Sequence, residues 1–283
     1  MKISEILKSA TDILQSSGIL DARREAASLL TFALEKDKTF LIAHSEYELS
    51  VAEESHFLEF LRRRARREPL QYITGRQEFF GLDFAVSPDV LIPRPETELI
   101  VENAIEILRG KTDAFFCEVG VGSGCISISI LHETKTARAV GLDVSQKALQ
   151  IAAKNAEKNN VAERLKLAIS DVFGVLQNER FDLIVSNPPY IASEDFASLQ
   201  AEVRDFEPRF ALTDDKDGLS IIEKIVRRAP EFLKPSGFLL LEIGFNQAEK
   251  VSKMFSPEIW QTFEILPDLQ GIPRTVKARK SKK

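Results

Sequence analysis

The sequence predicts an α/β fold, a Rossmann-like and mostly parallel sheet that follows a small N-terminal helical bundle. Three observations predict it. Strand-like and helix-like segments alternate from about residue 115 onward, a glycine-rich loop joins the first such strand to a helix, and the residues before about 68 carry helical periodicity. Alternation of this kind is typical of a parallel sheet with helices on both faces.

The first domain is expected over residues 1–75. Apolar residues repeat at helical spacing from Ile3 to about residue 68, which predicts several amphipathic helices. Gly18 should end the first helix, Asp21 should cap the second and Pro69 should follow the last. Eleven Lys or Arg stand against twelve Asp or Glu here, so the bundle has no basic patch and is not an obvious RNA-binding module.

The second domain is expected over 96–283, after a hairpin or linker at 76–95, where aromatic and β-branched residues are broken by Gly and Pro. Its predicted strands are 115–119, 137–142, 164–170, 181–186 and 238–243, with two more within 259–277, and its predicted helices are 123–132, 145–158 and 218–233. The basic run from Lys277 to Lys283 is interpreted as a solvated tail.

Composition narrows the class of protein. With 44% hydrophobic residues, the 283-residue chain can fill a sizeable core, and its net charge of −5 disfavours broad nucleic-acid binding. The start lacks a signal-peptide pattern and no apolar run is long enough to cross a bilayer, so we expect a cytoplasmic protein. Cys117 and Cys125 are too few for a disulfide framework or a metal quartet, and we expect buried, reduced thiols and no metal site.

A ligand-binding turn is predicted where the first strand of the sheet ends. The segment from Glu118 to Gly124 reads Glu-Val-Gly-Val-Gly-Ser-Gly and opens a helix. Glycines let the backbone approach a ligand, and the helix N-terminus offers free N–H groups to an anion such as a carboxylate. The spacing is Gly-x-Gly-x-Gly, which differs from the dinucleotide fingerprint, and no Lys-Ser or Lys-Thr pair follows to make a phosphate loop.

Two acidic residues follow later strands. Asp143 ends the second strand, 23 residues after Gly120, where a carboxylate can accept both hydroxyls of a ribose. The alternative is that Asp143 or Ser145 caps the next helix, and we assign the cap to Ser145. Asp171 and Val172 follow the third strand, where they could read an adenine edge. The pattern predicts a nucleoside-type ligand, but spacing alone does not choose among such cofactors.

The fourth strand runs directly into Asn187-Pro188-Pro189-Tyr190. Proline fixes φ and lacks an N–H, so the turn is rigid and leaves carbonyl groups free to accept hydrogen bonds. The Asn187 side chain adds a further acceptor and Tyr190 a flat face. This set suits a planar NH2 group, although Asn before Pro is also an ordinary turn starter.

The motif series resembles that of class I methyltransferases, which implies S-adenosyl-L-methionine as cofactor and S-adenosyl-L-homocysteine as product. By that resemblance the glycine loop holds the methionine part, Asp143 the ribose, and Asp171 with Val172 the adenine. Asn-Pro-Pro-Tyr resembles the catalytic motif of enzymes that methylate planar NH2 groups, either adenine or glutamine. The implied cofactor-binding residues are Glu118, Gly120, Val121, Gly122, Ser123, Gly124, Asp143, Asp171, Val172 and Asn187, and the implied catalytic residues are Asn187, Pro188, Pro189 and Tyr190.

Further motifs resemble the release-factor glutamine methyltransferase family: Pro93-Arg-Pro-Glu-Thr-Glu98, Glu207-Pro208, Asp217-Gly-Leu219, and Leu241-Glu-Ile-Gly244 with Gln247. The resemblance implies methylation of the glutamine in the Gly-Gly-Gln motif of class I peptide chain release factors, with the N-terminal domain contacting the factor. Asn187 and the Pro188 carbonyl would hold the glutamine amide, and Tyr190 would pack beside it. The family often has an aromatic residue where Val172 stands.

Other interpretations stay open at this point. The substrate could be a glutamine of a ribosomal protein, or an adenine of nucleic acid, which the acidic net charge disfavours; a non-catalytic scaffold is a further alternative. Arg94 and Glu98 could shape a lid over the cofactor or cap the following helix. The Arg62–Arg67 run could dock an acidic partner or ribosomal RNA, and a solvated helix face is the favoured interpretation.

Overall fold

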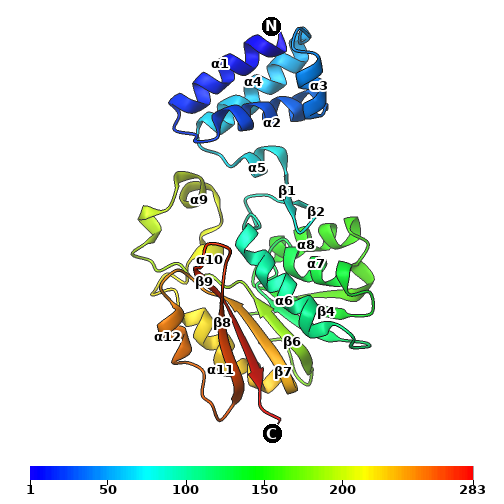
Figure 1. Cartoon of the computed structure of the whole chain (residues 1–283), viewed down its shortest axis with the longest axis vertical. Coiled ribbons are helices and arrows are strands. Elements are labelled where there is room, and N and C mark those ends of the chain that lie inside the picture. The colour runs from blue at the N-terminus through cyan, green and yellow to red at the C-terminus, as the bar shows by residue number, and fades with distance from the viewer. Residues whose placement is uncertain (283) are drawn as a thin grey trace. The chain divides into compact units, whose positions relative to one another are not determined.

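The structure is a computed structural model that describes residues 1–282, and the chain forms two compact units (Figure 1). The first, here called the helical unit, comprises Met1–Arg76 together with Gln200–Phe206. The second, the sheet unit, comprises Gln77–Leu199 and the chain from Glu207 onward. The segment at 200–206 therefore packs with the helical unit, although it lies far along the chain from the other residues of that unit.

The helical unit is built around amphipathic helices. Their fully buried side chains, among them Leu14, Leu29 and Phe57, form one apolar cluster. Local sequence sets their ends, since Gly18 follows the first helix with a φ of +77° and Ser50 accepts a hydrogen bond from the Glu53 N–H as an N-cap. The helices are α1 (Ile3–Ser16), α2 (Ala22–Leu34), α3 (Lys38–Ala43), α4 (Val51–Ala65), α5 (Leu70–Thr74) and α9 (Ala201–Phe206).

The sheet unit contains a seven-stranded sheet in the order β5-β4-β3-β6-β7-β9-β8 among the described residues. Neighbouring strands from β5 to β7 are parallel, whereas β9 is antiparallel to both β7 and β8. A separate hairpin, β1 (Arg76–Phe79) with β2 (Leu82–Ala85), precedes the sheet. The sheet strands are β3 (Phe115–Val119), β4 (Arg138–Asp143), β5 (Leu165–Ile169), β6 (Phe181–Ser186), β7 (Leu233–Glu242), β8 (Trp260–Pro267) and β9 (Pro273–Lys280).

Helices cover both faces of this sheet (Figure 1). Successive side chains of a strand point to opposite faces of the sheet. In β6, Ile184 belongs to one apolar cluster, whereas Leu183 and Val185 belong to the other, so both faces are buried. The cluster around Ile184 includes α11 and α12, and the opposite cluster includes α6, α7 and α8. The helices and short turns are α6 (Glu98–Leu108), α7 (Cys125–Glu133), α8 (Gln146–Lys158), α10 (Arg209–Leu212), α11 (Ser220–Phe232), α12 (Ala248–Ser252), η1 (Pro95–Thr97), η2 (Ala162–Arg164) and η3 (Phe196–Ser198).

The prediction of a solvated tail from Lys277 is wrong for the residues up to Lys280. They belong to β9, where Val276 and Ala278 are fully buried against the sheet. The Lys280 ammonium donates to the carbonyl oxygens of Pro230 and Leu233 at 2.6 and 2.9 Å. The strand alternates apolar and basic residues, a pattern that resembles a charged run in the sequence. Lys283 lies outside the described residues.

The favoured interpretation of the Arg62–Arg67 run as a solvated helix face is also wrong for Arg64. Its guanidinium is buried and pairs with Glu25 of α2 and with Glu202 of α9, the latter at 3.1 Å. Arg67 binds the other oxygen of Glu202 at 2.6 Å. The run holds the helical unit together through partners that are distant in sequence.

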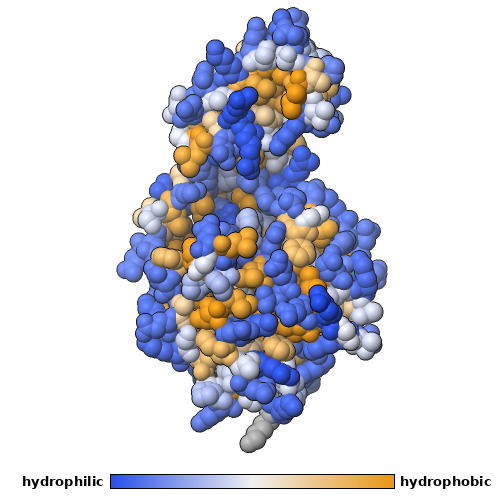
Figure 2. All heavy atoms as spheres, in the orientation of Figure 1, coloured by the Kyte–Doolittle hydropathy of each residue, from blue (hydrophilic) through white to orange (hydrophobic). Residues whose placement is uncertain are grey.

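The surface of the protein carries both hydrophilic and apolar residues. The face in Figure 2 is mostly hydrophilic, with apolar patches between the charged residues. Leu20 and Ile42 are among the large apolar side chains exposed on the helical unit. Within residues 1–282, no helix combines the length and apolar character that crossing a bilayer would require.

Candidate active site

The glycine loop follows β3 at the carboxyl edge of the sheet. The N–H groups of Gly120 and Val121 both donate to the Leu142 carbonyl at the end of β4, at 2.8 and 3.0 Å, which fixes the loop against the neighbouring strand. Gly124 has a φ of +84°, and a Cβ atom there would lie 2.7 Å from the Ile128 side chain. Glycine is therefore required where the loop turns into α7.

Asp143 holds the loop from the next strand. One carboxylate oxygen accepts from the Gly122 N–H at 2.9 Å, and the other accepts from the Ser145 N–H at 2.9 Å. Burial raises its pKa, and the hydrogen bonds from these backbone amides oppose that shift. Ser145 caps α8 by accepting from the Ala148 N–H, as the assignment of the cap expects. A carboxylate has four acceptor sites, so Asp143 can also accept from a ligand such as a diol.

Glu118 lies beneath the loop with its side chain fully buried. It accepts a hydrogen bond from the Ser127 N–H in the first turn of α7 at 2.9 Å. Burial raises the pKa of Glu118 to about 8, and the nearby Asp143 acts in the same direction. The Asn155 side chain fastens the loop from a further side, because it donates to the Ser123 carbonyl at 2.8 Å.

The turn after β5 presents Asp171 and Val172 to the same cavity. Val172 is buried with a φ of +51°, a conformation that a β-branched residue rarely adopts. The Ser170 hydroxyl stabilises this turn by donating to the Val172 carbonyl at 2.9 Å. The Asp171 carboxylate is largely exposed and pairs with Lys224 of α11.

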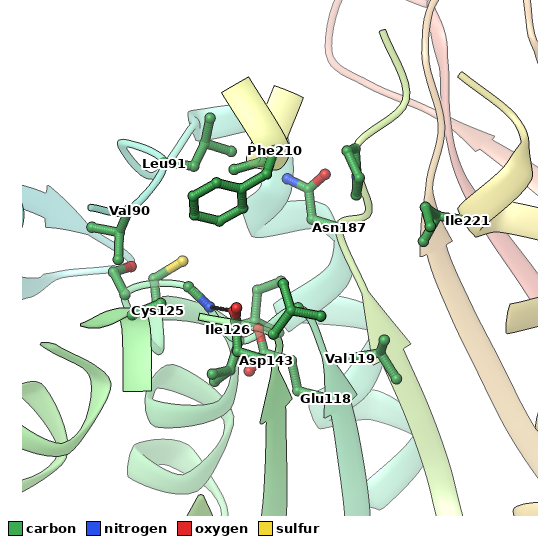
Figure 3. Close-up of a pocket in the computed structure, with 18 of the residues that line it drawn as sticks. Val90, Leu91, Glu118, Val119, Cys125, Ile126, Asp143, Asn187, Phe210 and Ile221 are labelled. Carbon is green, nitrogen blue, oxygen red and sulfur yellow. Dashed lines mark hydrogen bonds between the residues drawn. The ribbon is translucent and has the colours of Figure 1, made fainter. Parts of the chain in front are cut away.

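These segments line one cavity at the carboxyl edge of the sheet (Figure 3). Gly124, the N-cap of α7, is not among the residues that line it. Of the four residues predicted to be catalytic, Asn187 and Pro189 line the cavity, whereas Pro188 and Tyr190 do not. The other predicted residues on its wall are Glu118, Gly120, Val121, Gly122, Ser123, Asp143, Asp171 and Val172.

Asn187 lies at the rim of the cavity, at the end of β6 (Figure 3). The strand end is fixed to β3 by the Ser186 hydroxyl, which donates to the Val119 carbonyl at 2.6 Å. The Asn187 amide nitrogen donates to the Thr97 hydroxyl oxygen at 3.0 Å. Tyr190 turns away from the cavity, and its hydroxyl donates to Glu242 at 3.1 Å.

The cavity also contains residues that carried no role at the level of sequence. The Phe210 ring from α10 lies across the opening, between Leu91 and Asn187 (Figure 3). Thr97 lies within the Pro93–Glu98 motif, and Phe210 follows the Glu207-Pro208 motif by two residues. This proximity to motifs of the family resemblance is the signal in the sequence that points to them. The cavity residues without a predicted role include Asp89, Val90, Leu91, Thr97, Phe210 and Ile221.

Arg94 and Glu98 have separate structural roles. Arg94 lines the cavity and pairs with the buried carboxylate of Glu207, which also accepts from the Ile92 N–H at 3.1 Å. Glu98 begins α6 and accepts from the Phe80 N–H at 2.9 Å, so it fastens the loop of the β1–β2 hairpin. Within residues 1–282, no cluster of three or more His, Cys, Asp or Glu side chains is arranged to hold a metal ion.

Family models match both parts of the chain. The model described as the PrmC N-terminal domain matches residues 5–75, and the model described as the methyltransferase small domain matches residues 97–203. Among solved structures, a methyltransferase from Pyrococcus furiosus superimposes with a TM-score of 0.54 at 18% identity, covering 78% of this chain and 98% of that one. The predicted class I methyltransferase fold is confirmed.

Curated relatives match over nearly the whole length. A release factor glutamine methyltransferase of Geobacter sulfurreducens is 43% identical over 277 residues, which cover 98% of this chain and 96% of the relative. Proteins of the same name from Cereibacter sphaeroides and Koribacter versatilis are 40% and 38% identical, each with 99% of both chains covered.

Proposed function

We propose, since this chain belongs to the release factor glutamine methyltransferase family, that it methylates the glutamine of the Gly-Gly-Gln motif in class I peptide chain release factors. The methyl group comes from S-adenosyl-L-methionine and goes to the side-chain amide nitrogen, leaving S-adenosyl-L-homocysteine. The observation that carries the proposal is the position of Asn187, whose amide is fixed at the rim of a cavity that the glycine loop and Asp143 also line.

The lining of the cavity fits this cofactor. Asp143 keeps acceptor sites for the two ribose hydroxyls, and a Cβ atom built at Gly122 would meet no atom within 4 Å, so the loop leaves open space beside its backbone. Val172 would pack against the adenine and Asp171 would accept from its amino group. When bound, the cofactor supplies an electrophilic methyl group on a sulfonium.

The substrate amide is a poor nucleophile because its lone pair is delocalised, so positioning is the main requirement. The Asn187 side-chain oxygen and the Pro188 carbonyl would each accept one N–H of the glutamine NH2 group. Two such acceptors fix the nitrogen in the plane that transfer needs, and positioning of bound partners can supply about 7 kcal/mol or more in good cases.

No strong general base is needed, because the N-methylated amide that forms first is acidic enough to lose a proton to water. The histidines of this chain, His44, His56 and His132, lie outside the residues that line the cavity. Tyr190 would support the amide site through Glu242 and the turn geometry, since its own ring does not line the cavity.

Recognition of the whole factor would fall to the helical unit, which matches the family's N-terminal domain. Its Lys and Arg residues are balanced by Asp and Glu, which suits a protein partner better than nucleic acid. We place the reaction in the cytoplasm, where release factors act. Residues 1–75, 76–95 and 96–283 would then be the recognition domain, the connecting hairpin and the catalytic domain.

The experiment incubates the purified chain and methyl-labelled S-adenosylmethionine with a release factor, and separately with the factor whose Gly-Gly-Gln is changed to Gly-Gly-Ala. Label on the unmodified factor alone supports the proposal. Asn187→Ala should abolish transfer while cofactor affinity, measured by calorimetry, stays within a few-fold. Label on ribosomal protein or on nucleic acid, with the release factor unlabelled, would refute the proposed substrate.

A further inference from the structure

Asn187 is the first member of a chain of hydrogen bonds that leads away from the cavity. Its amide nitrogen donates to the Thr97 hydroxyl oxygen at 3.0 Å. The Thr97 hydroxyl in turn donates to one oxygen of the Glu242 carboxylate at 2.6 Å. Thr97 and Glu242 are 2% and 1% exposed, so no solvent competes for these bonds.

The other end of the chain is fixed as well. The second oxygen of Glu242 accepts from the Tyr190 hydroxyl at 3.1 Å. Tyr190 belongs to the same turn as Asn187, and its carbonyl accepts from the Gln247 side chain at 2.8 Å. Burial raises the pKa of the Glu242 carboxyl, and the hydrogen bonds from Thr97 and Tyr190 oppose that shift. In its ionised form the carboxylate has acceptor sites only, so it takes the single proton of each hydroxyl.

This directionality decides which way the Asn187 amide faces. Once the Thr97 hydroxyl has given its proton to Glu242, its oxygen can only accept, and of the two ends of an amide only the NH2 group can donate. A flipped amide would place its oxygen against the Thr97 oxygen, two acceptors without a proton between them. The Asn187 carbonyl oxygen is therefore the end left for a ligand.

We propose that Thr97 and Glu242 are positioning residues that set the orientation of the Asn187 amide, so that its oxygen accepts from the NH2 group of the substrate. The inference rests on the proposed function for the identity of that group. A reversed amide would present its own NH2 to the glutamine NH2 and would repel the substrate. Thr97 and Glu242 are 145 residues apart in the sequence, and their effect on the substrate would pass through Asn187.

The test replaces the hydroxyl without changing shape. Thr97→Val should lower kcat by about tenfold to a hundredfold, the range typical when a hydrogen-bonding partner that orients a metal-binding residue is lost, with cofactor affinity within threefold. Thr97→Ser keeps the hydroxyl and should restore kcat to within about threefold of the unsubstituted protein. Thr275→Val is the matched control, since Thr275 is fully buried and pairs with Glu242 across β7 and β9. Within residues 1–282, its hydroxyl has no hydrogen-bond partner.

Glu242→Gln tests the same chain of hydrogen bonds at Glu242, and it replaces Thr97→Val as the test if that variant does not fold. In a glutamine, an NH2 group replaces one of the two carboxylate oxygens, so one of the two hydroxyls faces a donor in place of its acceptor, and kcat should fall with a smaller change in KM. Full kcat in Thr97→Val or in Glu242→Gln would overturn the inference, as would failure of Thr97→Ser to restore kcat.

A second measurement does not depend on transfer. In the 15N-labelled protein, Asn187→Asp identifies the side-chain NH2 resonances of Asn187 by their loss. These resonances should move in Thr97→Val and stay in place in Thr275→Val. Unmoved resonances in Thr97→Val would overturn the inference whatever the substrate is, whereas moved resonances in a protein that labels no glutamine would refute the proposed function alone.

Discussion

The carbonyl oxygen of Tyr190 occupies the space that a side chain at Gly218 would need. A Cβ atom at Gly218 would lie 2.1 Å from that oxygen, and Gly218 has a φ of +75°. Since the obstructing atoms are backbone, an alanine can be accommodated only if the turn containing Tyr190 shifts. Gly218→Ala should therefore lower kcat by at least tenfold, because a shift of about 1 Å near the reacting groups can cost about a hundredfold.

The matched control for this substitution is Gly110→Ala. Gly110 has nearly the same backbone angle, a φ of +76°, but no atom of the described residues lies within 4 Å of a Cβ atom placed there. Both variants carry the same backbone penalty of about 1–2 kcal/mol for a left-handed alanine, measurable by urea unfolding, and only Gly218→Ala should lose activity. Equal activity of the two variants would show that the close approach has no effect on the site.

The two acidic residues of the cofactor site should contribute unequally to cofactor affinity. Asp143 is buried, whereas the Asp171 side chain is 65% exposed and already paired with Lys224. Hydrogen bonds to a charged group contribute about 1.5–3 kcal/mol, so loss of two should weaken cofactor binding by about a hundredfold or more in Asp143→Ala. Asp171→Ala should lose less than about tenfold.

Calorimetric titration with S-adenosylmethionine measures both affinities, and thermal unfolding checks that each variant is folded. Asp143 also holds the Gly122 and Ser145 N–H groups, so its variant should unfold at a lower temperature as well. A larger loss for Asp171→Ala than for Asp143→Ala would reverse the assignment of the ribose contact.

The buried carboxyl group of Glu118 makes stability depend on pH in the ligand-free protein. Its pKa is about 8 when folded against an ordinary value of 4.5, so between these pH values the unfolded chain has lost a proton that the folded chain keeps. The contribution of the protonated Glu118 to the free energy of unfolding is complete below pH 4.5 and is lost as pH rises toward 8. The free energy of unfolding falls by up to about 1.4 kcal/mol per pH unit over this range.

Urea unfolding from pH 5 to 8 measures this dependence, and Glu118→Gln isolates it from Asp143 and Glu242, whose pKa values are also raised by burial. Glutamine cannot ionise, so the variant should lose less stability over this range than the unsubstituted protein. The same decline in both proteins would assign the effect to other groups.

Arg64 should be essential to the helical unit. Its removal leaves Glu25 and Glu202 without their shared cation, and breaking a buried pair in this way typically costs about 3–5 kcal/mol. Arg64→Ala should therefore lower the free energy of unfolding far more than Arg66→Ala, a change at an exposed position in the same run. Similar losses for the two variants would contradict the structural role of Arg64.

The sequence predicts best where local pattern determines the structure. The strands at 115–119 and 181–186 have the predicted bounds, because each is an apolar run ended by Gly or by Asn-Pro-Pro. The strand expected at 238–243 begins earlier, at Leu233, since its first part contains Pro235 and Gly237, which resemble a turn.

What the sequence could not predict depends on partners far along the chain. Arg64 pairs with residues 39 and 138 positions away, so its neighbours in sequence give no sign that it is buried. Thr97 stands in a motif that carried the family resemblance, yet its contact with Glu242 appears only when η1 and β7 come together. Charge runs and motifs identify the important segments, and tertiary contacts determine which atoms act.

The place of β9 in the sheet constrains the order in which this unit can form. It lies between β7 and β8, and β8 has no other strand partner among the described residues. β9 is synthesised after β8, and until the two strands pair, the hydrogen-bonding edges of β8 have no strand partner. The nascent sheet can close only when β9 inserts, and until then β7 is also an open edge that chaperones or other nascent chains can reach.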